Sequence, residues 1–342
     1  MRTKAEVLKE HYPEGYADDQ ELFRLKYKFL EVEVPKPWIV TKSPYEAPEH
    51  PDIPSVDEIE KAMEENRLTQ RYGHHDVCRI GNCVVKGGPQ HTILLEAENL
   101  LFLQEHSKVR TPKVYAFFSV PKEPYDIHYL VTEFIEGEHI YGEKWDALDD
   151  EAREIICSKI SEQFRLLRAV PSEGYYGRVY HQAFPSALSL CRIRESNSGP
   201  YDSYEDLVSA MYASAELRAA DSVTINVADH HPHTLGLLSK FKPLLARATG
   251  YKPTLTHMDA GPVNYLVRSI KGVGGKVVDW EVVIIDWDSL VWLPAFVQAA
   301  RMDPFSYAEG WEQVLQKIAG GFDDPFTEER DFIVHDLTFY EL

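Results

Sequence analysis

Two short polar stretches, each following an apolar run, constrain the fold of this chain most strongly. Residues 255–267 read Leu-Thr-His-Met-Asp-Ala-Gly-Pro-Val-Asn-Tyr-Leu-Val, and residues 282–288 read Val-Val-Ile-Ile-Asp-Trp-Asp. An aspartate and an asparagine five residues apart, Asp259 and Asn264, precede an apolar strand and suit a short loop between two buried strands. Asp286 ends another apolar run. We therefore expect it at the mouth of the same cleft.

These three side chains are suited to magnesium-assisted phosphoryl transfer. Asp259 would accept the proton of an attacking hydroxyl, while Asn264 and Asp286 would hold a metal ion that bridges nucleotide phosphates. His257 precedes Asp259 by two residues, and we expect it to support the loop by hydrogen bonding. The alternative for Asp259 is a structural aspartate that caps a turn.

Composition limits the classes of protein and partner. The 342 residues suffice for two lobes with sizeable cores, and 44% hydrophobic with 27% charged residues is ordinary for a soluble protein. A net charge of −19 argues against nucleic acid or an anionic membrane as partner and is compatible with a cationic substrate. No apolar run approaches the ~20 residues that span a bilayer, and the N-terminus lacks a signal-peptide core. We therefore expect a cytoplasmic protein.

Local patterns predict several elements before this polar region. The first ~50 residues, rich in proline, are expected to wrap over the first lobe, and Ser55 with Glu58 three residues on is a helix start. Residues 76–86 form two β-branched runs around Gly81-Asn82, which is typical of a hairpin. Its cysteines, Cys78 and Cys83, are expected to face each other as buried free thiols.

Lys86 ends this hairpin, and a helix over residues 94–106 follows, opening with Glu96 and Glu98. Taken alone, Lys86 would be a solvated strand end. Further on, Asp149 or Asp150 is predicted to cap a helix that runs to about residue 169, and Ser203 to precede another. Helices near 306–319 and 327–340 are predicted to close the chain.

Several motifs in one order resemble a known family. These are Val-Val-Lys at 84–86, Glu-Ala-Glu at 96–98, Pro-Lys-Val-Tyr at 112–115, His-x-Asp-x4-Asn at 257–264 and Ile-Asp-Trp-Asp at 285–288. The chain resembles the aminoglycoside phosphotransferase and choline kinase family, with the closest likeness to its fungal branch. The resemblance implies an α+β, bilobal, protein-kinase-like fold with a small antiparallel-sheet lobe and a mainly helical large lobe. The expected parts are an N-terminal extension and helix (1–68), an N-lobe (69–136) and a C-lobe (137–342).

The resemblance also assigns nucleotide contacts. Lys86 would position the α- and β-phosphates, paired with Glu98, which matches the family spacing better than Glu96. Residues 129–137 resemble the interlobe hinge, so the Glu133 carbonyl and the Ile135 amide would face adenine, with Thr132 at the back of the pocket. The segment 71–76, which has a single glycine, would cover the phosphates.

The function that follows is an ATP- and Mg²⁺-dependent phosphotransferase that moves the γ-phosphate to a hydroxyl of a small molecule. Regions 172–250 and 290–342 would bind the acceptor, which the sequence does not name. The alternative is a catalytically silent kinase-fold protein that binds nucleotide or a partner. A protein kinase is disfavoured, because no segment after Asp286 resembles an activation loop ending in Ala-Pro-Glu.

Overall fold

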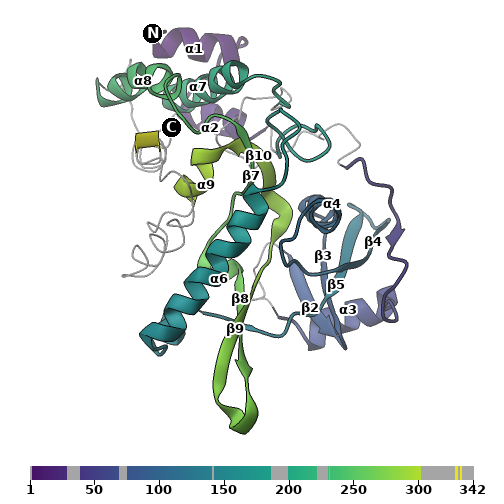
Figure 1. Cartoon of the computed structure of the whole chain (residues 1–342). Coiled ribbons are helices and arrows are strands. Elements are labelled where there is room, and N and C mark those ends of the chain that lie inside the picture. The colour runs from purple at the N-terminus through teal and green to yellow at the C-terminus, as the bar shows by residue number, and fades with distance from the viewer. Residues whose placement is uncertain are drawn as a thin grey trace.

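The computed structural model describes residues 2–28, 39–68, 75–140, 142–185, 199–221, 230, 232–301, 328–329 and 332. A small lobe built on an antiparallel sheet lies beside a larger, mainly helical lobe (Figure 1). This is the α+β, two-lobed arrangement that the sequence predicts. Residues 71–74 of the expected phosphate-covering segment, and nearly all of the predicted C-terminal helices, lie outside the described residues.

The small lobe contains a five-stranded sheet in the order β1-β4-β5-β3-β2. Its strands are β1 (Tyr45–Glu46), β2 (Asp76–Ile80), β3 (Cys83–Gly88), β4 (Val114–Val120) and β5 (Ile127–Glu133). Successive side chains of a strand point to opposite faces. Tyr129 and Val131 therefore pack with helix α3 (Val56–Glu65), while Leu130 between them packs with helix α4 (Thr92–His106).

Two local predictions for this lobe have different outcomes. Ser55 caps α3 in a full capping box with Glu58, as predicted. The expected contact of Cys78 with Cys83 is wrong, because the β2–β3 register places Cys78 opposite Val85. Both cysteines are nevertheless buried free thiols, since each points into the core shared with α3.

The large lobe combines helices with two small antiparallel sheets. Helices α6 (Asp150–Arg168) and α7 (Tyr204–Ala220) begin after the predicted caps Asp149 and Ser203. The other elements are α5 (Glu143–Asp146), α8 (Pro232–Leu245), α9 (Ala295–Arg301), the pair β7 (Pro253–His257) with β10 (Leu290–Pro294), and the sheet of β6 (Glu138–His139), β8 (Tyr265–Lys271) and β9 (Val277–Ile284).

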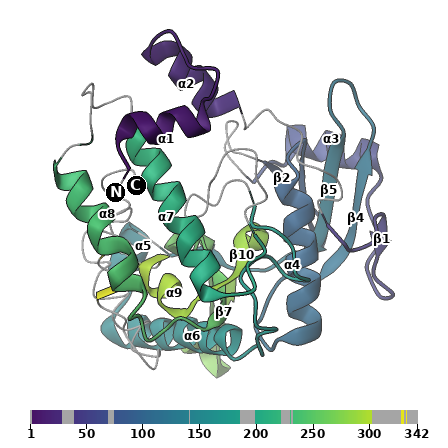
Figure 2. The ribbon, with the colours of Figure 1, turned by 90° about the horizontal axis from the view of Figure 1, so that it is seen from above.

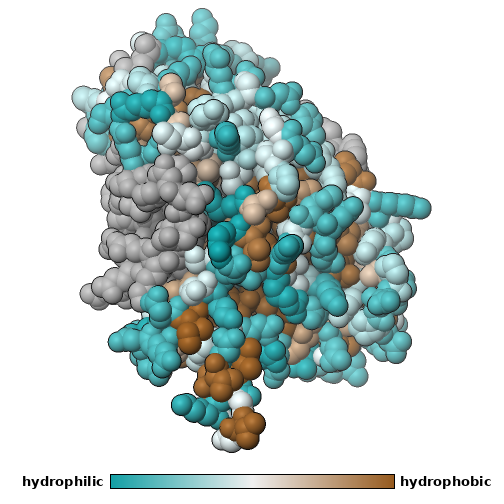
Figure 3. All heavy atoms as spheres, viewed as in Figure 1, coloured by the Kyte–Doolittle hydropathy of each residue, from teal (hydrophilic) through white to brown (hydrophobic). Residues whose placement is uncertain are grey.

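The hairpin of β8 and β9 projects beyond the body of the large lobe (Figure 1). Its tip carries exposed valines, Val273 and Val278 among them. Figure 3 shows hydrophobic side chains at the lower end of the molecule, where the hairpin projects in Figure 1. At its base the hairpin packs against α6, where Phe164 meets Tyr265 and Ile284 in one apolar cluster; nearer the tip, Lys159 of that helix pairs with Asp279. The base of the hairpin is thus fixed to the large lobe, and this base carries the polar residues of interest.

The N-terminal region contacts both lobes. Helix α1 (Lys4–His11) lies on α7 (Figure 2), where Val7 and Leu8 pack against Leu217. A second helix, α2 (Asp19–Lys28), follows it, and β1 later joins the edge of the small-lobe sheet. The expectation that this region wraps over the first lobe is therefore correct only for its later part. The apolar side of α1 instead covers α7. Within the described residues, no helix combines the length and apolar character needed to cross a membrane.

Candidate active site

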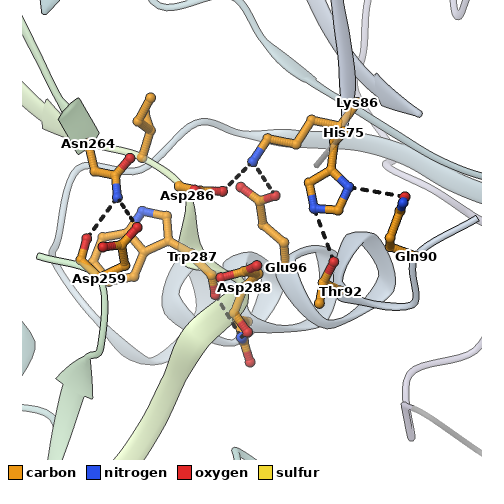
Figure 4. A network of polar contacts seen from close by, with 12 residues as sticks. His75, Lys86, Gln90, Thr92, Glu96, Asp259, Asn264, Asp286, Trp287 and Asp288 are labelled. Carbon is orange, nitrogen blue, oxygen red and sulfur yellow. Dashed lines mark hydrogen bonds and ion pairs between the residues drawn. The ribbon is translucent and has the colours of Figure 1, made fainter. Parts of the chain in front are cut away.

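Strand pairing brings the two predicted polar stretches together. In the β8–β9 pair Tyr265 lies opposite Ile284, and the amide of Ile285 donates to the Asn264 carbonyl at 2.9 Å. Asn264, just before β8, therefore lies beside the end of β9, after which Asp286 follows. The β7–β10 pair similarly places the loop with Asp259 next to the Asp286 loop. Figure 4 shows Asp259, Asn264 and Asp286 in this one region.

Asp259 and Asn264 form one hydrogen-bonded unit. The Asn264 amide nitrogen donates to the Asp259 carbonyl at 2.7 Å and to its carboxylate at 2.9 Å. Asn264 is buried, whereas Asp259 is exposed. Because both amide hydrogens are engaged, the Asn264 Oδ1 is the atom left to act as a ligand. The aspartate faces solvent, where a substrate hydroxyl can approach.

His257 supports the loop that carries Asp259 through hydrogen bonds. Its Nδ1 accepts from the Asp259 amide at 3.2 Å, and its Nε2 donates to the Ile285 carbonyl at 3.1 Å. Burial lowers the pKa of His257, so the ring is the neutral tautomer with its proton on Nε2. Gln298 pairs with both backbone groups of His257. The histidine thus joins the two loops, which is the supporting position predicted for it.

Lys86 extends from β3 between two carboxylates (Figure 4). Its Nζ lies 2.6 Å from Glu96 on α4 and 2.6 Å from Asp286. The expected pairing of Lys86 with Glu98 is therefore wrong, and the partner is Glu96. Residues two apart on a helix point about 200° from each other, so only one of the two glutamates can face the lysine. Glu98 is fully buried and contacts Arg178 instead.

The charges at this site are unbalanced. Burial would lower the pKa of Lys86, but Glu96 and Asp286 outweigh it and raise that pKa. Burial opposes the ionisation of Asp286, yet the adjacent ammonium holds its pKa below the usual value. Burial, together with Asp286 and Glu96, raises the pKa of Asp288 to about 7. Two carboxylates contact one ammonium, and the Asp288 carboxyl lies within electrostatic range of all three, so the site favours an additional cation.

Asn264 and Asp286 supply the hard oxygen atoms that Mg²⁺ prefers. No group of three or more His, Cys, Asp or Glu suited to a metal ion occurs in the described parts of the chain. That finding does not conflict with a magnesium site, because Mg²⁺ bound with a nucleotide uses one or two protein carboxylates plus phosphate oxygens. The residues present therefore fit a nucleotide-bound magnesium ion.

Comparison with known proteins assigns the family. Residues 77–302, about two thirds of the chain, match the model of the phosphotransferase enzyme family. The chain belongs to the phosphotransferase enzyme family. A search of curated protein sequences finds no match.

Solved structures agree with this phosphotransferase in fold. The ADP-bound aminoglycoside phosphotransferase APH(2'')-Ib has 14% identity and a TM-score of 0.51, over 83% of this chain and 88% of that one. A thermostable mutant of APH(4)-Ia with AMP-PNP and hygromycin B has 13% identity and a TM-score of 0.52, over 80% and 85%. At such identities the similarity establishes the fold alone. The protein-kinase-like fold predicted from the sequence is confirmed.

The residues expected to form the hinge lie at the end of β5 and directly after it. The Glu133 amide donates to the Lys113 carbonyl at 2.8 Å, and its carboxylate pairs with Arg110. Thr132 and Ile135 are both 8% exposed. Among the residues that the structure describes, the Ile135 amide finds no acceptor. An amide with no acceptor in the described part of the chain can donate to a ligand, and the adenine contacts expected here stay predictions.

Sequence reasoning overlooked the residues that hold the site from a distance. Asn99 on α4 donates to the carbonyls of Trp287 at 2.7 Å and Asp288 at 3.3 Å, which ties α4 to the loop after Asp286. Gln298 and Arg178 are similar cases. Asn99 alone had a local signal, as a polar residue directly before the apolar run of residues 100–103.

Proposed function

We propose that this protein is an ATP- and Mg²⁺-dependent phosphotransferase that transfers the γ-phosphate of ATP to a hydroxyl of a small molecule. The observation that carries the proposal is the position of Lys86, 2.6 Å from both Glu96 and Asp286. A lysine on a strand, paired with a helix glutamate beside a metal-binding aspartate, is the arrangement that positions phosphates in kinase-like enzymes. Here the three residues come from separate parts of the chain.

Each side chain has a distinct role in the proposed reaction. Lys86, fixed by Glu96, binds the α- and β-phosphates, and the hinge after β5 receives adenine through the Glu133 carbonyl and the Ile135 amide. Asp259 orients the acceptor hydroxyl and takes its proton as the bond to phosphorus forms. Its carboxylate suits this role because it is exposed and fixed at one oxygen by Asn264.

Asn264 and Asp286 would hold magnesium through Oδ1 and the carboxylate. When bound, the ion neutralises charge on the β- and γ-phosphates. Lys86 contacts Asp286 directly, so a positive charge lies beside the Asp286 carboxylate even without a metal ion. The excess of carboxylates described above supports binding of the cation together with nucleotide.

The acceptor is proposed only as a class. Structures of the same fold include complexes with a nucleotide and either hygromycin B or streptomycin. The net charge of −19 favours a cationic acceptor over an anionic one. Amine-bearing alcohols and sugars are therefore the first acceptors to test.

The test is ADP release from Mg²⁺-ATP with a panel of amino-alcohols, aminoglycosides, sugars and hydroxylated metabolites. Asp259→Asn should lower kcat by about 10²- to 10⁴-fold and leave MgADP binding within a few-fold. Asp279→Asn is the matched control, since that half-exposed aspartate pairs with Lys159 and lies outside the proposed site. Nucleotide binding without release for any acceptor would favour the silent alternative, and full activity in Asp259→Asn would refute the assigned base.

A further inference from the structure

Glu98, which does not face Lys86, has an unusual environment of its own. It lies in the middle of α4 with no exposed surface. Its Oε1 accepts from the amides of Val40 and Thr41 at 2.8 and 2.9 Å, and from the Thr41 hydroxyl at 2.9 Å. Its Oε2 accepts from Arg178 at 2.8 Å and from Gln182 at 2.6 Å. One carboxylate therefore joins α4, the N-terminal region and the large lobe.

The pair of Glu98 with Arg178 is buried on both sides, with side-chain exposures of 0% and 4%. Removing two opposite charges from water is costly, and such a pair contributes little net stability compared with apolar residues of similar size. Stability alone is thus a weak reason for placing this pair here. Fixing the geometry of the segments that it joins is a stronger one.

The loop that carries Arg178 and Gln182 has a strained backbone. We call residues 175–182 the clamp loop. Tyr180 and His181 have φ values of 60° and 56°, which large side chains seldom adopt unless the surrounding structure requires it. The backbones of Arg178 and Gln182 pair across this turn, at 2.9 and 3.3 Å. The turn thereby presents both side chains to Glu98.

The position of α4 decides whether Glu96 can reach Lys86. A helix turns about 100° per residue, so a modest rotation of α4 would move Glu96 away from the lysine. The residue before the helix, His91, makes no side-chain cap. The orientation of α4 therefore depends on the clamp loop and not on a side-chain cap. Tyr180 of this loop also packs edge-on against Phe102 of α4, with ring centroids 5.5 Å apart.

We propose that Arg178, together with Gln182, is a positioning residue of the phosphotransferase: through Glu98 it holds α4 in the orientation in which Glu96 fixes Lys86 for the nucleotide phosphates. The inference rests on the proposed function. The clamp loop contains Tyr176, which pairs with Tyr201, and both lie within the region expected to bind the acceptor. The clamp thus links that region to the lysine that binds phosphate.

Arg178→Lys tests the proposal, because it keeps the charge and removes the planar fork of donors. At a temperature well below Tm, MgADP affinity measured by calorimetry should fall about tenfold, the factor for one lost hydrogen bond to a buried charged group. Hydrogen exchange of the α4 amides should accelerate. Gln182→Ala keeps the ion pair of Glu98 with Arg178 and should therefore disturb folding less than Arg178→Lys does. It should lower MgADP affinity and accelerate α4 exchange by smaller factors. Arg168→Lys is the control, since Arg168 donates to the Ala295 carbonyl far from α4 in sequence.

Three outcomes are decisive. Weaker MgADP binding and faster α4 exchange in both clamp variants, with neither in the control, would support the positioning role. Unchanged affinity and exchange, with only a lower Tm, would overturn it and leave Arg178 a stabilising residue. Failure of the wild type to bind MgADP would refute the proposed function; α4 exchange would still decide about the clamp, and an unchanged rate in Arg178→Lys would overturn it.

Discussion

Lys86→Met should destabilise the protein even without nucleotide, because it removes the ammonium that contacts both Glu96 and Asp286. Breaking a fully buried ion pair costs about 3–5 kcal/mol. Asp286 is 36% exposed and Glu96 only 6%, so solvent screens the first carboxylate and hardly the second. We therefore expect the free energy of unfolding at pH 7.5 to fall by about 2–4 kcal/mol.

The amount by which Lys86→Met lowers the free energy of unfolding, here called the deficit, should depend on pH in a defined direction. In the wild type the folded-state pKa of Asp286 is depressed. Its stabilising contribution is therefore present above the unfolded pKa and is lost as the pH falls through the folded value. In the variant, burial and mutual repulsion raise the pKa of both unpaired carboxyl groups above their unfolded values. Their penalty is absent at low pH and appears as the pH rises, so the deficit should be smaller at pH 4.5 than at pH 7.5.

Urea denaturation of both proteins at pH 4.5 and pH 7.5 measures this difference. Lys159→Met is the matched control, because its ion pair with Asp279 is 43% and 42% exposed and such pairs contribute about 0–1 kcal/mol. A deficit of Lys86→Met that is no larger than that of the control would refute the reasoning. So would a deficit that grows as the pH is lowered.

Two further predictions concern the small lobe. Ser55→Ala removes the capping box of α3 and should lower the free energy of unfolding by about 1 kcal/mol, as measured by thermal and urea denaturation; an unchanged Tm would show that packing alone holds the helix. The buried thiol of Cys78, whose pKa burial raises to about 11, should resist alkylation by iodoacetamide at pH 8 in the native state and react in urea. Rapid native labelling, mapped by mass spectrometry, would contradict its burial.

Much of the fold was predictable because its signals are local. A cap such as Ser55 or Asp149 is read from neighbouring residues, and both begin helices in the structure. The hairpin pattern at residues 76–86 also holds, because turn and strand preferences act within a few residues. The contact of α1 with α7 was not predictable. It joins apolar faces about 200 residues apart, and neither segment alone indicates its partner.

The polar loops were predictable for a related reason. Asp259, Asn264 and Asp286 each follow or precede an apolar strand. In the antiparallel pair of β8 and β9 the start of one strand lies beside the end of the other, which brings Asn264 near Asp286. Their neighbours in space were not predictable. Asn99 contacts the carbonyl of Trp287, 188 residues away, and Gln298 contacts His257 from α9. Such contacts depend on how helices pack against the sheets.

The Glu-Ala-Glu stretch of α4 shows the limit of spacing as evidence. Counting from the following strand favours Glu98, but counting cannot give the rotation of a helix, and α4 is buried on nearly all sides so that its apolar pattern defines no single face. What decides the matter is the rest of the chain. Glu98 is fully occupied by donors from the N-terminal region and the clamp loop, and this fixes Glu96 on the opposite side, toward Lys86. The two glutamates therefore have different partners: Glu96 contacts Lys86, and Glu98 contacts the N-terminal region and the clamp loop.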